Sequence, residues 1–498
     1  MQRYLTILEV SQKQAYIFAS NKLSENIVNS EVIAKILSPG YLAEVLKGTG
    51  YRENKNMVYS GGGHTILEFE TEDESYQCVA LLTETIYRDF DGISVFAQTI
   101  PYDENKLPKN NLKELTRELE KKKSERLSYF RQGTYGVEKI DAATLSAVPE
   151  KEESEAKKQI RENEYFVEKS FYPDGVTPVM AFGELGGSRD ESNFIAVIHV
   201  DGNGMGKRVE EFYDTIGTSD WNITKEKLRE FSESIDKDFK RAFRNMATVV
   251  GSNLKNGKLK DLDIQDNRFP LRRIITAGDD ICFITEGRIG IECAVVFLEE
   301  LNKFSSYTAC AGVALVHQKF PFYKAYGLAE QLCKNAKIFG SNISPQDKGS
   351  SVSVVDWHIE FGEMGDSLEA IRRNYITGDG DCLFMRPYLV AAPDGIMEAP
   401  ALAGRRYGDF KRLIRLLQGK VKEKSYPVGK VKELRGALKA GETITANYLR
   451  FNRMEDLLME AIPDQDKPDI AKAGSALFDA IELMDTFLSL ERGEGVQR

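Results

Sequence analysis

The stretch IAVIHVDGNGMGK, residues 195–207, decides the fold. It predicts a strand that ends at an aspartate and is followed by a glycine-rich loop. The residues before Asp201 are almost all apolar, as in a strand that is buried on both faces. Glycines with little bulk follow, and their backbone lets a triphosphate approach closely. These glycines are Gly202, Gly204 and Gly206.

A second stretch, IITAGDDICFIT at 274–285, places two adjacent acids between two hydrophobic arms. It predicts a β-hairpin with Asp279 and Asp280 at its turn. The segments around the hairpin have the periodicity of helices and strands, and they give the order β-α-α-β-β-α-β-α-β. This order is typical of a ferredoxin-like split βαβ core with an extra helix and a trailing strand. The first and third strands are neighbours in that topology, so we expect Asp201 to lie close to the hairpin acids.

The N-terminal region contains a fainter copy of the same order. Strands are indicated by QRYLTILEV and ISVFAQTI, and a hairpin with glycines at its turn by NMVYSGGGHTILEFE. The matching order predicts an internal duplication. The copy lacks the acids, because Glu9 stands near the place of Asp201 and GGGH at 61–64 stands where AGDD would be.

The pattern predicts an α+β protein in four regions. Two ferredoxin-like units occupy 1–101 and 191–361, a charged helical or linker region occupies 102–190, and a helical C-terminal domain occupies 362–498. Within the charged region, NLKELTRELEKKKSERL predicts an exposed helix.

The composition narrows the class of protein. Of the 498 residues, 42% are hydrophobic, which excludes global disorder. A net charge of −10 argues against nonspecific binding of duplex nucleic acid, but it permits an anionic nucleotide that is held through a cation. No run approaches about 18 apolar residues, and no signal peptide is indicated, so we expect no membrane association. Six cysteines without a C-x-x-C pair predict reduced thiols in a cytoplasmic protein.

Carboxylates that converge at one end of a sheet repel one another unless a cation lies among them. Hard oxygen ligands beside the Gly202 carbonyl suit Mg²⁺ or Mn²⁺. Lys207 at the start of the next helix and Lys337 at the end of GLAEQLCKNAK are candidate phosphate contacts. Such a site would perform in-line phosphoryl transfer with release of pyrophosphate.

Each motif alone has an ordinary explanation. The glycine loop fits neither the dinucleotide fingerprint nor a P-loop, and GDD by itself is a common turn. His199 lies within a strand and is expected to be a packed histidine, while His64 either touches a base or faces solvent. Asp379 and Asp381 lack the other positions of a calcium loop and indicate an acidic surface loop. The catalytic interpretation is favoured because the glycine loop and the hairpin acids occur together in one unit, each at the expected end of its strand.

The second half of the chain resembles the second palm domain of the large polymerase–cyclase subunit of type III CRISPR systems, in HVDGNGMGK, TAGDDICFI, ACAGVALVHQKFPFYKAYGLAEQLCKNAK and LFMRPY. The first half resembles the first, degenerate palm domain of that subunit, in SQKQAYIFASNKLSEN and YSGGGHTILEF. The resemblance covers about 1–100 and 190–390, and moderately the helical C-terminus. It implies two ferredoxin-like palm domains with helical insertions and a helical C-terminal domain.

The resemblance implies a nucleotidyltransferase that converts ATP into cyclic oligoadenylate messengers in antiphage defence, with one ATP held by each palm. Asp201, Asp279 and Asp280 would be the catalytic residues, and together with the Gly202 carbonyl they would bind Mg²⁺ or Mn²⁺. The expected nucleotide-binding set combines both lines of reasoning: Gly202, Asn203, Gly204, Gly206, Lys207, Gly278, Lys337, Gly61, Gly62 and Gly63.

The chain departs from the family pattern at several places. Ala277 and Gly278 precede the acids where two glycines are usual, which makes the motif GGDD-like, and Asn203 stands where a second aspartate is common. No histidine is followed by aspartate and no zinc-binding cysteine cluster is present, so we expect a compact form without the HD nuclease domain.

Several alternatives stay open from the sequence. The protein could be a stand-alone, homodimeric synthase, or a subunit that works with other CRISPR subunits and with guide and target RNA. It could also be an RNA-binding scaffold subunit without synthesis, or a template-dependent polymerase. A diguanylate cyclase would share the palm, but it would need guanine-selective contacts that the sequence does not identify.

Overall fold

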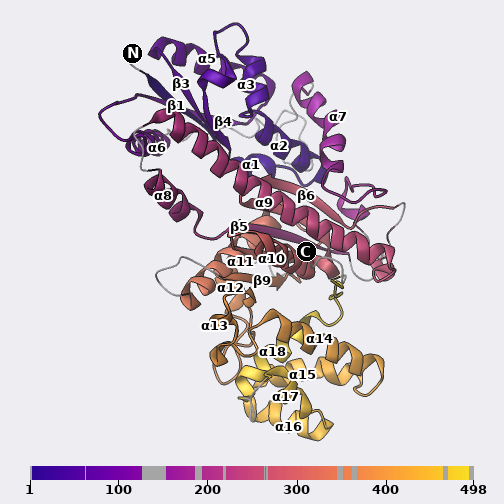
Figure 1. Cartoon of the computed structure of the whole chain (residues 1–498). Helices are drawn as coiled ribbons and strands as arrows, with labels where there is room; N and C mark the ends of the chain where they lie inside the picture. Colours follow the sequence, from indigo (N-terminus) through magenta and orange to yellow (C-terminus); the bar gives the residue numbers. More distant parts are fainter. Residues whose placement is uncertain are drawn as a thin grey trace.

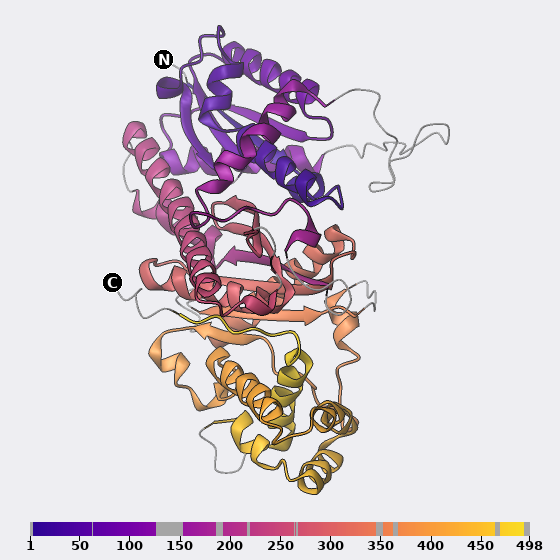
Figure 2. The ribbon, with the colours of Figure 1, turned by 90° about the vertical axis from the view of Figure 1, so that its right-hand side faces the viewer.

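The computed structural model describes residues 3–61, 63–125, 153–185, 193–216, 220–262, 264, 267–344, 352–361, 367–463 and 469–492. The ribbon has three parts that follow one another along the length of the molecule (Figure 1). A first sheet lies at one end, a second sheet lies in the middle, and the C-terminal helices lie at the other end, as the side view in Figure 2 also shows.

The first sheet has four strands in the order β2-β3-β1-β4, and its neighbouring strands are antiparallel. Its strands are β1 (Tyr4–Ser11), β2 (Met57–Gly61), β3 (His64–Phe69) and β4 (Ser94–Pro101). The accompanying helices are α1 (Lys13–Ile17), α2 (Leu23–Lys35), α3 (Pro39–Val45), α4 (Glu53–Asn56), α5 (Glu72–Asp89), α6 (Pro108–Ser124) and α7 (Glu155–Lys169).

The second sheet has six strands in the order β10-β9-β8-β5-β7-β6, with β8 and β9 parallel. Its strands are β5 (Phe194–Gly202), β6 (Leu271–Ala277), β7 (Asp280–Glu286), β8 (Ala309–His317), β9 (Ser353–Ile359) and β10 (Tyr388–Ala391). Its helices are α8 (Met205–Thr215), α9 (Trp221–Lys255), α10 (Gly290–Phe304) and α11 (Phe322–Ile343). The run β6-β7-β5-β8 repeats the order of the first sheet, which confirms the predicted pair of ferredoxin-like units.

Helix α9 joins the two sheets into one structure. Its 35 residues span about 52 Å at the rise of an α-helix. Trp221 and Leu228 near its start pack with the first sheet, whereas Phe239, Phe243 and Met246 pack in the core of the second. Since one continuous helix contributes to both cores, it sets the separation of the two sheets.

The alternation of side chains in β5 assigns its two faces to different partners. Ala196, Ile198 and Val200 face the core that α9 and α10 cover. Ile195 and Val197 belong to a different cluster, which includes residues of α11 and of α2. Helix α11 and helices of the first unit together cover this face of the second sheet. His199 and Asp201 also project from it, because strand side chains alternate with a period of two.

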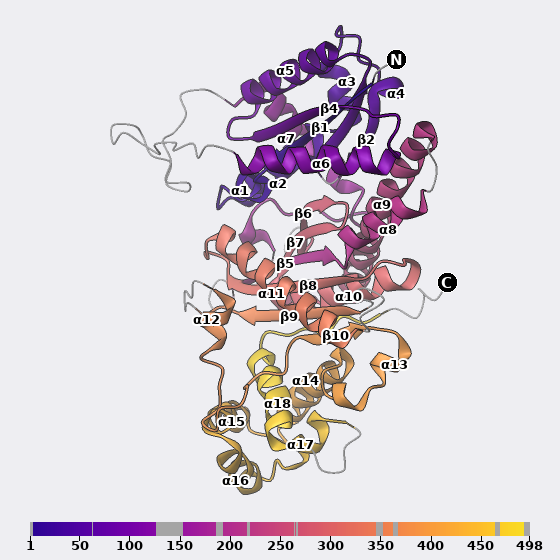
Figure 3. The same ribbon diagram turned by 90° about the vertical axis from the view of Figure 1, so that its left-hand side faces the viewer.

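Helix α6 differs from the exposed helix that the charge pattern predicted. Leu112, Leu115 and Leu119 are buried and pack with Leu5 and Ile7 of β1, and Figure 3 shows α6 lying along the first sheet. The lysines and glutamates that dominate its sequence cover only the outer face.

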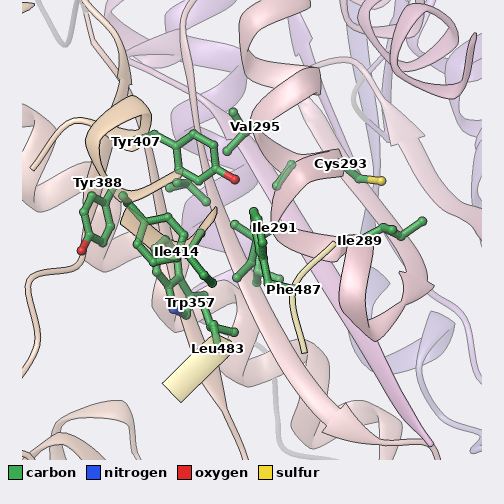
Figure 4. Close-up of a cluster of buried hydrophobic side chains, with 14 of the residues drawn as sticks. Ile289, Ile291, Cys293, Val295, Trp357, Tyr388, Tyr407, Ile414, Leu483 and Phe487 are labelled. Carbon is green, nitrogen blue, oxygen red and sulfur yellow. The ribbon is translucent and has the colours of Figure 1, made fainter. Parts of the chain in front are cut away.

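The C-terminal region is mostly helical, as predicted, although it also contributes edge strand β10. Its helices are α12 (Leu368–Arg372), α13 (Asp394–Met397), α14 (Tyr407–Lys422), α15 (Val428–Ala440), α16 (Glu442–Asn452), α17 (Asp456–Ala461) and α18 (Ile470–Leu483). Trp357 of β9 stacks on Tyr388 of β10 with ring centroids 5.0 Å apart, within an apolar cluster that joins this region to the second sheet (Figure 4). Among the described residues, no helix is long and apolar enough to cross a membrane.

Gly312 of β8 allows α11 to lie directly on the second sheet. A Cβ atom at this position would lie 2.0 Å from the Ala329 carbonyl oxygen and 2.4 Å from the Cys333 nitrogen, both in the backbone of α11. Gly312 pairs with His199 in the neighbouring strand. The missing side chain therefore fixes the height of α11 above the end of β5.

We expect Gly312→Ala to destabilise the protein by about 1–3 kcal/mol, because the added methyl group must push α11 away from β8. Gly327→Ala is the matched control, since a Cβ there meets nothing within 4 Å and alanine favours a helix. Urea denaturation of the two variants checks this expectation. Equal stability of both variants would show that α11 does not depend on Gly312.

Candidate functional site

The end of β5 and the β6–β7 hairpin bring the predicted acids together. Asp201 is the direct partner of Asp280 in the antiparallel β5–β7 ladder. The hairpin has two turn residues, Gly278 and Asp279, between the paired Ala277 and Asp280. Gly278 has φ of 65°, a conformation that glycine adopts without strain and that suits the first position of a type II′ turn. The turn therefore presents both acids next to the end of β5.

Gly202 is required for this close approach. A Cβ at position 202 would lie 2.9 Å from both the Cβ and the Oδ2 atoms of Asp279. Any larger residue would push the hairpin acid away from Asp201.

Lys337 offsets the negative charge of Asp201 at the end of β5. Its ammonium group donates to Asp201 Oδ2 at 2.6 Å and to the Gly202 carbonyl at 2.7 Å. These two oxygens are among the ligands that the sequence assigned to a metal ion, so the lysine lies where a cation is needed. The sequence predicted Lys337 as a phosphate contact, whereas here its partners are protein oxygens.

The hairpin acids hold their protons more tightly than ordinary aspartates. Burial and the negative charge of Asp201 raise the pKa of Asp279 to about 6. Burial, with the charges of Asp201 and Asp279, raises the pKa of Asp280 to about 7. Asp280 Oδ1 is buried without a hydrogen-bond partner, while the side chain as a whole stays 39% exposed because it faces a cavity. The site is thus short of positive charge.

Among the described residues, no group of three or more His, Cys, Asp or Glu side chains already has the arrangement of a metal centre. The reason is visible at two of the acids. Asp201 is engaged by Lys337, and Asp280 Oδ1 points toward His199, whose Nδ1 is 3.6 Å away. Oxygen donors of the right kind are present, and their rearrangement around a divalent ion requires the ammonium group to move.

A cavity of about 650 Å³ extends from the hairpin acids to the first sheet. On the side of the second sheet it is lined by the hairpin turn with Asp279 and Asp280, and α9 contributes Ser232, Asp236 and Lys240. Asp201, Gly202 and Lys337 do not line it, but they adjoin the hairpin acids that do. The volume lies within the range of small-molecule sites.

The first sheet presents the equivalent positions with different chemistry. Glu9 is paired with His64 in the ladder just as Asp201 is paired with Asp280, so His64 replaces one acid and Gly63 the other. Lys123 Nζ lies 3.1 Å from the Glu9 carboxylate. A Cβ at Gly63 would lie 2.3 Å from Lys13 Nζ, so the glycine makes room for a lysine at the hairpin.

All of these first-sheet groups line the cavity. Burial and the nearby Lys13 lower the pKa of His64 to about 4, which leaves the imidazole neutral. Gly61 and Gly63 also line the cavity, and Gly62 lies outside the described residues. The acids of the second unit therefore face lysines and a neutral histidine across one cavity.

Other residues of the predicted set do not face the cavity. The side chain of Asn203 is buried, and its Nδ2 donates to Thr308 Oγ1 at 3.0 Å and to the Val352 carbonyl at 2.8 Å, so it ties the end of β5 to the neighbouring chain segments. Gly204, Gly206 and Lys207 are exposed on the first turn of α8, and Lys207 lies 3.8 Å from Glu211.

Asp379 and His199, which the sequence analysis also considered, have structural roles. Asp379 Oδ2 accepts a hydrogen bond from the Glu442 backbone N–H at the start of α16. His199 is 5% exposed, as expected for a packed histidine, and burial lowers its pKa to about 4.

Sequence reasoning missed Lys13 and Lys123. Lys13 follows the first strand in SQKQ, and the internal duplication was the available signal, since it aligned the end of β1 with the end of β5. Lys123 had no such signal, because its helix was predicted to be exposed.

Residues 194–342 match the family model described as Cas10/Cmr2, second palm domain. The resemblance to the Cas10/Cmr2 family is confirmed. The second sheet with its helices is called the second palm below, and the first sheet with its helices, which has the same strand order, is called the first palm. Among curated proteins, none matches the chain.

Solved structures match over nearly the whole chain. A chain of the Csm1–Csm4 cassette in complex with cA3 aligns with a TM-score of 0.57 and 15% identity, covering 97% of this chain and 70% of that one. The cassette in complex with AMPPNP aligns at 0.53 and 14% identity, covering 96% and 70%. Csm1 in T. onnurineus aligns at 0.53 and 15% identity, again covering 97% and 70%. At this identity the similarity establishes the fold.

The raised pKa values predict a pH-dependent stability. A carboxyl group whose pKa is raised by folding favours the folded state at low pH and loses this contribution as the pH rises through its folded pKa. We therefore expect the double variant Asp279→Asn, Asp280→Asn to melt several degrees above the wild type at pH 8 in the presence of a chelator. The difference should shrink at pH 5, where the wild-type acids are protonated.

Thermal denaturation between pH 5 and pH 8 measures this effect, with the exposed Asp381→Asn as control. A melting difference that does not change with pH would contradict the assigned repulsion.

Proposed function

We propose that this protein is a metal-dependent nucleotidyltransferase that converts ATP into cyclic oligoadenylates and releases pyrophosphate. The observation that carries the proposal is the convergence of Asp201, Asp279 and Asp280 at the end of β5, where the hairpin acids open into the cavity between the palms. A clustered negative charge of this kind costs stability, so it needs a role that involves cations.

The donor set fits Mg²⁺ or Mn²⁺. Asp280 offers a buried oxygen without a partner, and Asp201 with the Gly202 carbonyl already binds one cation, the ammonium group of Lys337. Only oxygen donors are present at these positions, as both ions prefer. When bound, such an ion would lower the pKa of an attacking hydroxyl group and stabilise the charge on the phosphates.

Each residue of the site would then have its own role. Asp201, Asp279 and Asp280 would hold the cation, and Lys337 would leave Asp201 and pair with the triphosphate. Gly278 keeps the turn narrow enough for a nucleotide to reach the acids. The nucleotide on this palm is the one whose reacting groups are activated.

The first palm would hold the second nucleotide without activating it. Its hairpin has Gly63 and His64 in place of the acids, and Lys13 and Lys123 lie at the same end of the cavity. Ammonium groups can pair with a triphosphate directly, so no second metal site is needed on this side.

Adenine as the base and a cyclic product are supported by the neighbouring structures. Related Csm1–Csm4 cassettes have been solved in complex with one ATP, with pppApApA, with cA3 and with cA4. The same cassettes contain Csm4 beside Csm1, which supports an assembly of this chain with at least one other subunit. A place in antiphage defence is what the resemblance to type III CRISPR systems implies.

The first test replaces the hairpin acids. We expect Asp279→Ala with Asp280→Ala to reduce pyrophosphate release from ATP by more than about 10²-fold, because the cation then loses most of its charged ligands. Asp381→Ala, an exposed acid in the C-terminal region, is the control. Mass spectrometry of the products made from each NTP with Mg²⁺ or Mn²⁺ identifies the base and the ring. Unchanged turnover in the double variant would rule out the proposal.

The second test addresses the first palm. We expect Lys13→Met to raise the KM for ATP about tenfold or more, the value of one charge-assisted hydrogen bond, with a smaller effect on metal affinity. Lys106→Met is the matched control, because Lys106 is an exposed lysine on the same palm whose partner is Glu114. An unaltered KM for ATP in the Lys13 variant would contradict the proposed binding of a nucleotide by the first palm.

A further inference from the structure

A line of polar groups, of which Tyr326 and His199 are buried, connects the first palm to a hairpin acid of the second. Gln14 Nε2 of α1 donates to the Tyr326 hydroxyl of α11 at 2.9 Å. That hydroxyl lies 3.5 Å from His199 Nδ1, and the same nitrogen lies 3.6 Å from Asp280 Oδ1. Each of these groups belongs to a different element, and the line ends at the oxygen that has no hydrogen-bond partner.

The hydrogen-bonding capacity of these groups fixes the role of His199. The Tyr326 oxygen accepts from Gln14, and a neutral His199 that carries its proton on Nδ1 directs this N–H toward both the Tyr326 oxygen and Asp280 Oδ1. The two separations at His199 are longer than an ideal hydrogen bond, as is common at catalytic groups before substrate binds. Of these two separations, only the one between Tyr326 and His199 involves an atom of α11, so it depends on the position of that helix.

Aromatic packing places the tyrosine between the palms. Phe18 of the first palm lies against Tyr326 with ring centroids 4.1 Å apart, and it also contacts Phe322 at 5.5 Å. Tyr326 meets the ring of His199 edge-on at 5.5 Å. Tyr326 and His199 are 3% and 5% exposed, so water does not compete for their polar atoms.

We propose that Tyr326 is a positioning residue: held by Gln14 of the first palm, its hydroxyl group orients His199, and His199 in turn sets the direction of Asp280 Oδ1. The docking of the first palm thereby controls the geometry of the cation site on the second. This inference rests on the proposed function, but Tyr326 and His199, unlike Gln14, do not line the cavity proposed to hold the nucleotides.

The position of α11 supports the same conclusion. The helix carries Tyr326 above His199 and, three turns later, Lys337 beside Asp201. Both lie over the end of β5 because Gly312 brings the helix backbone onto β8. One helix therefore controls two of the three acids, Asp280 through the tyrosine and Asp201 through the lysine.

The test removes one hydroxyl group. Tyr326→Phe keeps the ring and its packing, and Tyr323→Phe on the same helix is the matched control, because Tyr323 is 56% exposed. Mn²⁺ affinity is measured by electron paramagnetic resonance on the full chain without nucleotide, and kcat and KM are measured by pyrophosphate release. We expect Tyr326→Phe to weaken Mn²⁺ binding about threefold to tenfold and to lower kcat with little change in KM, the effect of one buried hydrogen bond. Tyr323→Phe should match the wild type.

A second variant tests the connection to the first palm. Gln14→Leu should reproduce the loss of Mn²⁺ affinity, and the double variant Gln14→Leu, Tyr326→Phe should be no weaker than Tyr326→Phe alone, because both act through one path. Additive losses of Mn²⁺ affinity in the double variant would show that Gln14 and Tyr326 act independently, and they would overturn the proposed path from Gln14 through Tyr326.

The outcomes separate the two proposals. Wild-type Mn²⁺ affinity in the Tyr326→Phe variant overturns the positioning role, whatever the activity. A wild-type protein that binds Mn²⁺ but releases no pyrophosphate contradicts the proposed function, while the affinity shift of the variant still supports the positioning role. A wild-type protein that binds no Mn²⁺ overturns both.

Discussion

The chemistry of the site is governed by the repulsion between three aspartates at the ends of two neighbouring strands. Strand register places Asp201 opposite Asp280, and the hairpin turn adds Asp279 beside them, so the fold itself concentrates negative charge in a partly buried place. Lys337 offsets only part of this charge, since its ammonium group donates to Asp201 and to the Gly202 carbonyl. Burial, together with this remaining charge, raises the pKa values of Asp279 and Asp280. A divalent cation is the simplest group that would remove it.

The duplication explains why the cavity has two unlike walls. Both palms have the same strand order, and α9 contributes side chains to the cores of both. The equivalent hairpins therefore face one cavity, and their sequences have diverged in charge, with acids on one and a glycine, a histidine and nearby lysines on the other. An asymmetric pair of this kind suits a reaction in which one nucleotide is activated and the other is presented.

Much of the fold and the meeting of the acids could be predicted, because these features follow from local patterns. The apolar run before Asp201 and the arms around the hairpin define strands, and the order of elements then sets which strands are neighbours. The buried face of α6 was missed because its three leucines are outnumbered by charged residues. The role of Asn203 was missed because its partners, Thr308 and Val352, are distant in sequence. The contact of Gln14 with Tyr326 joins residues still farther apart, and no periodicity reveals it.

The most direct measurement of the central claim is the anomalous scattering of Mn²⁺ in crystals grown with a non-hydrolysable ATP analogue. The expected result is an Mn²⁺ peak bounded by the carboxylates of Asp201, Asp279 and Asp280, with Lys337 withdrawn from Asp201 and placed against the triphosphate. A map in which the analogue is bound, no peak lies among these aspartates and Lys337 still pairs with Asp201 would contradict the claim.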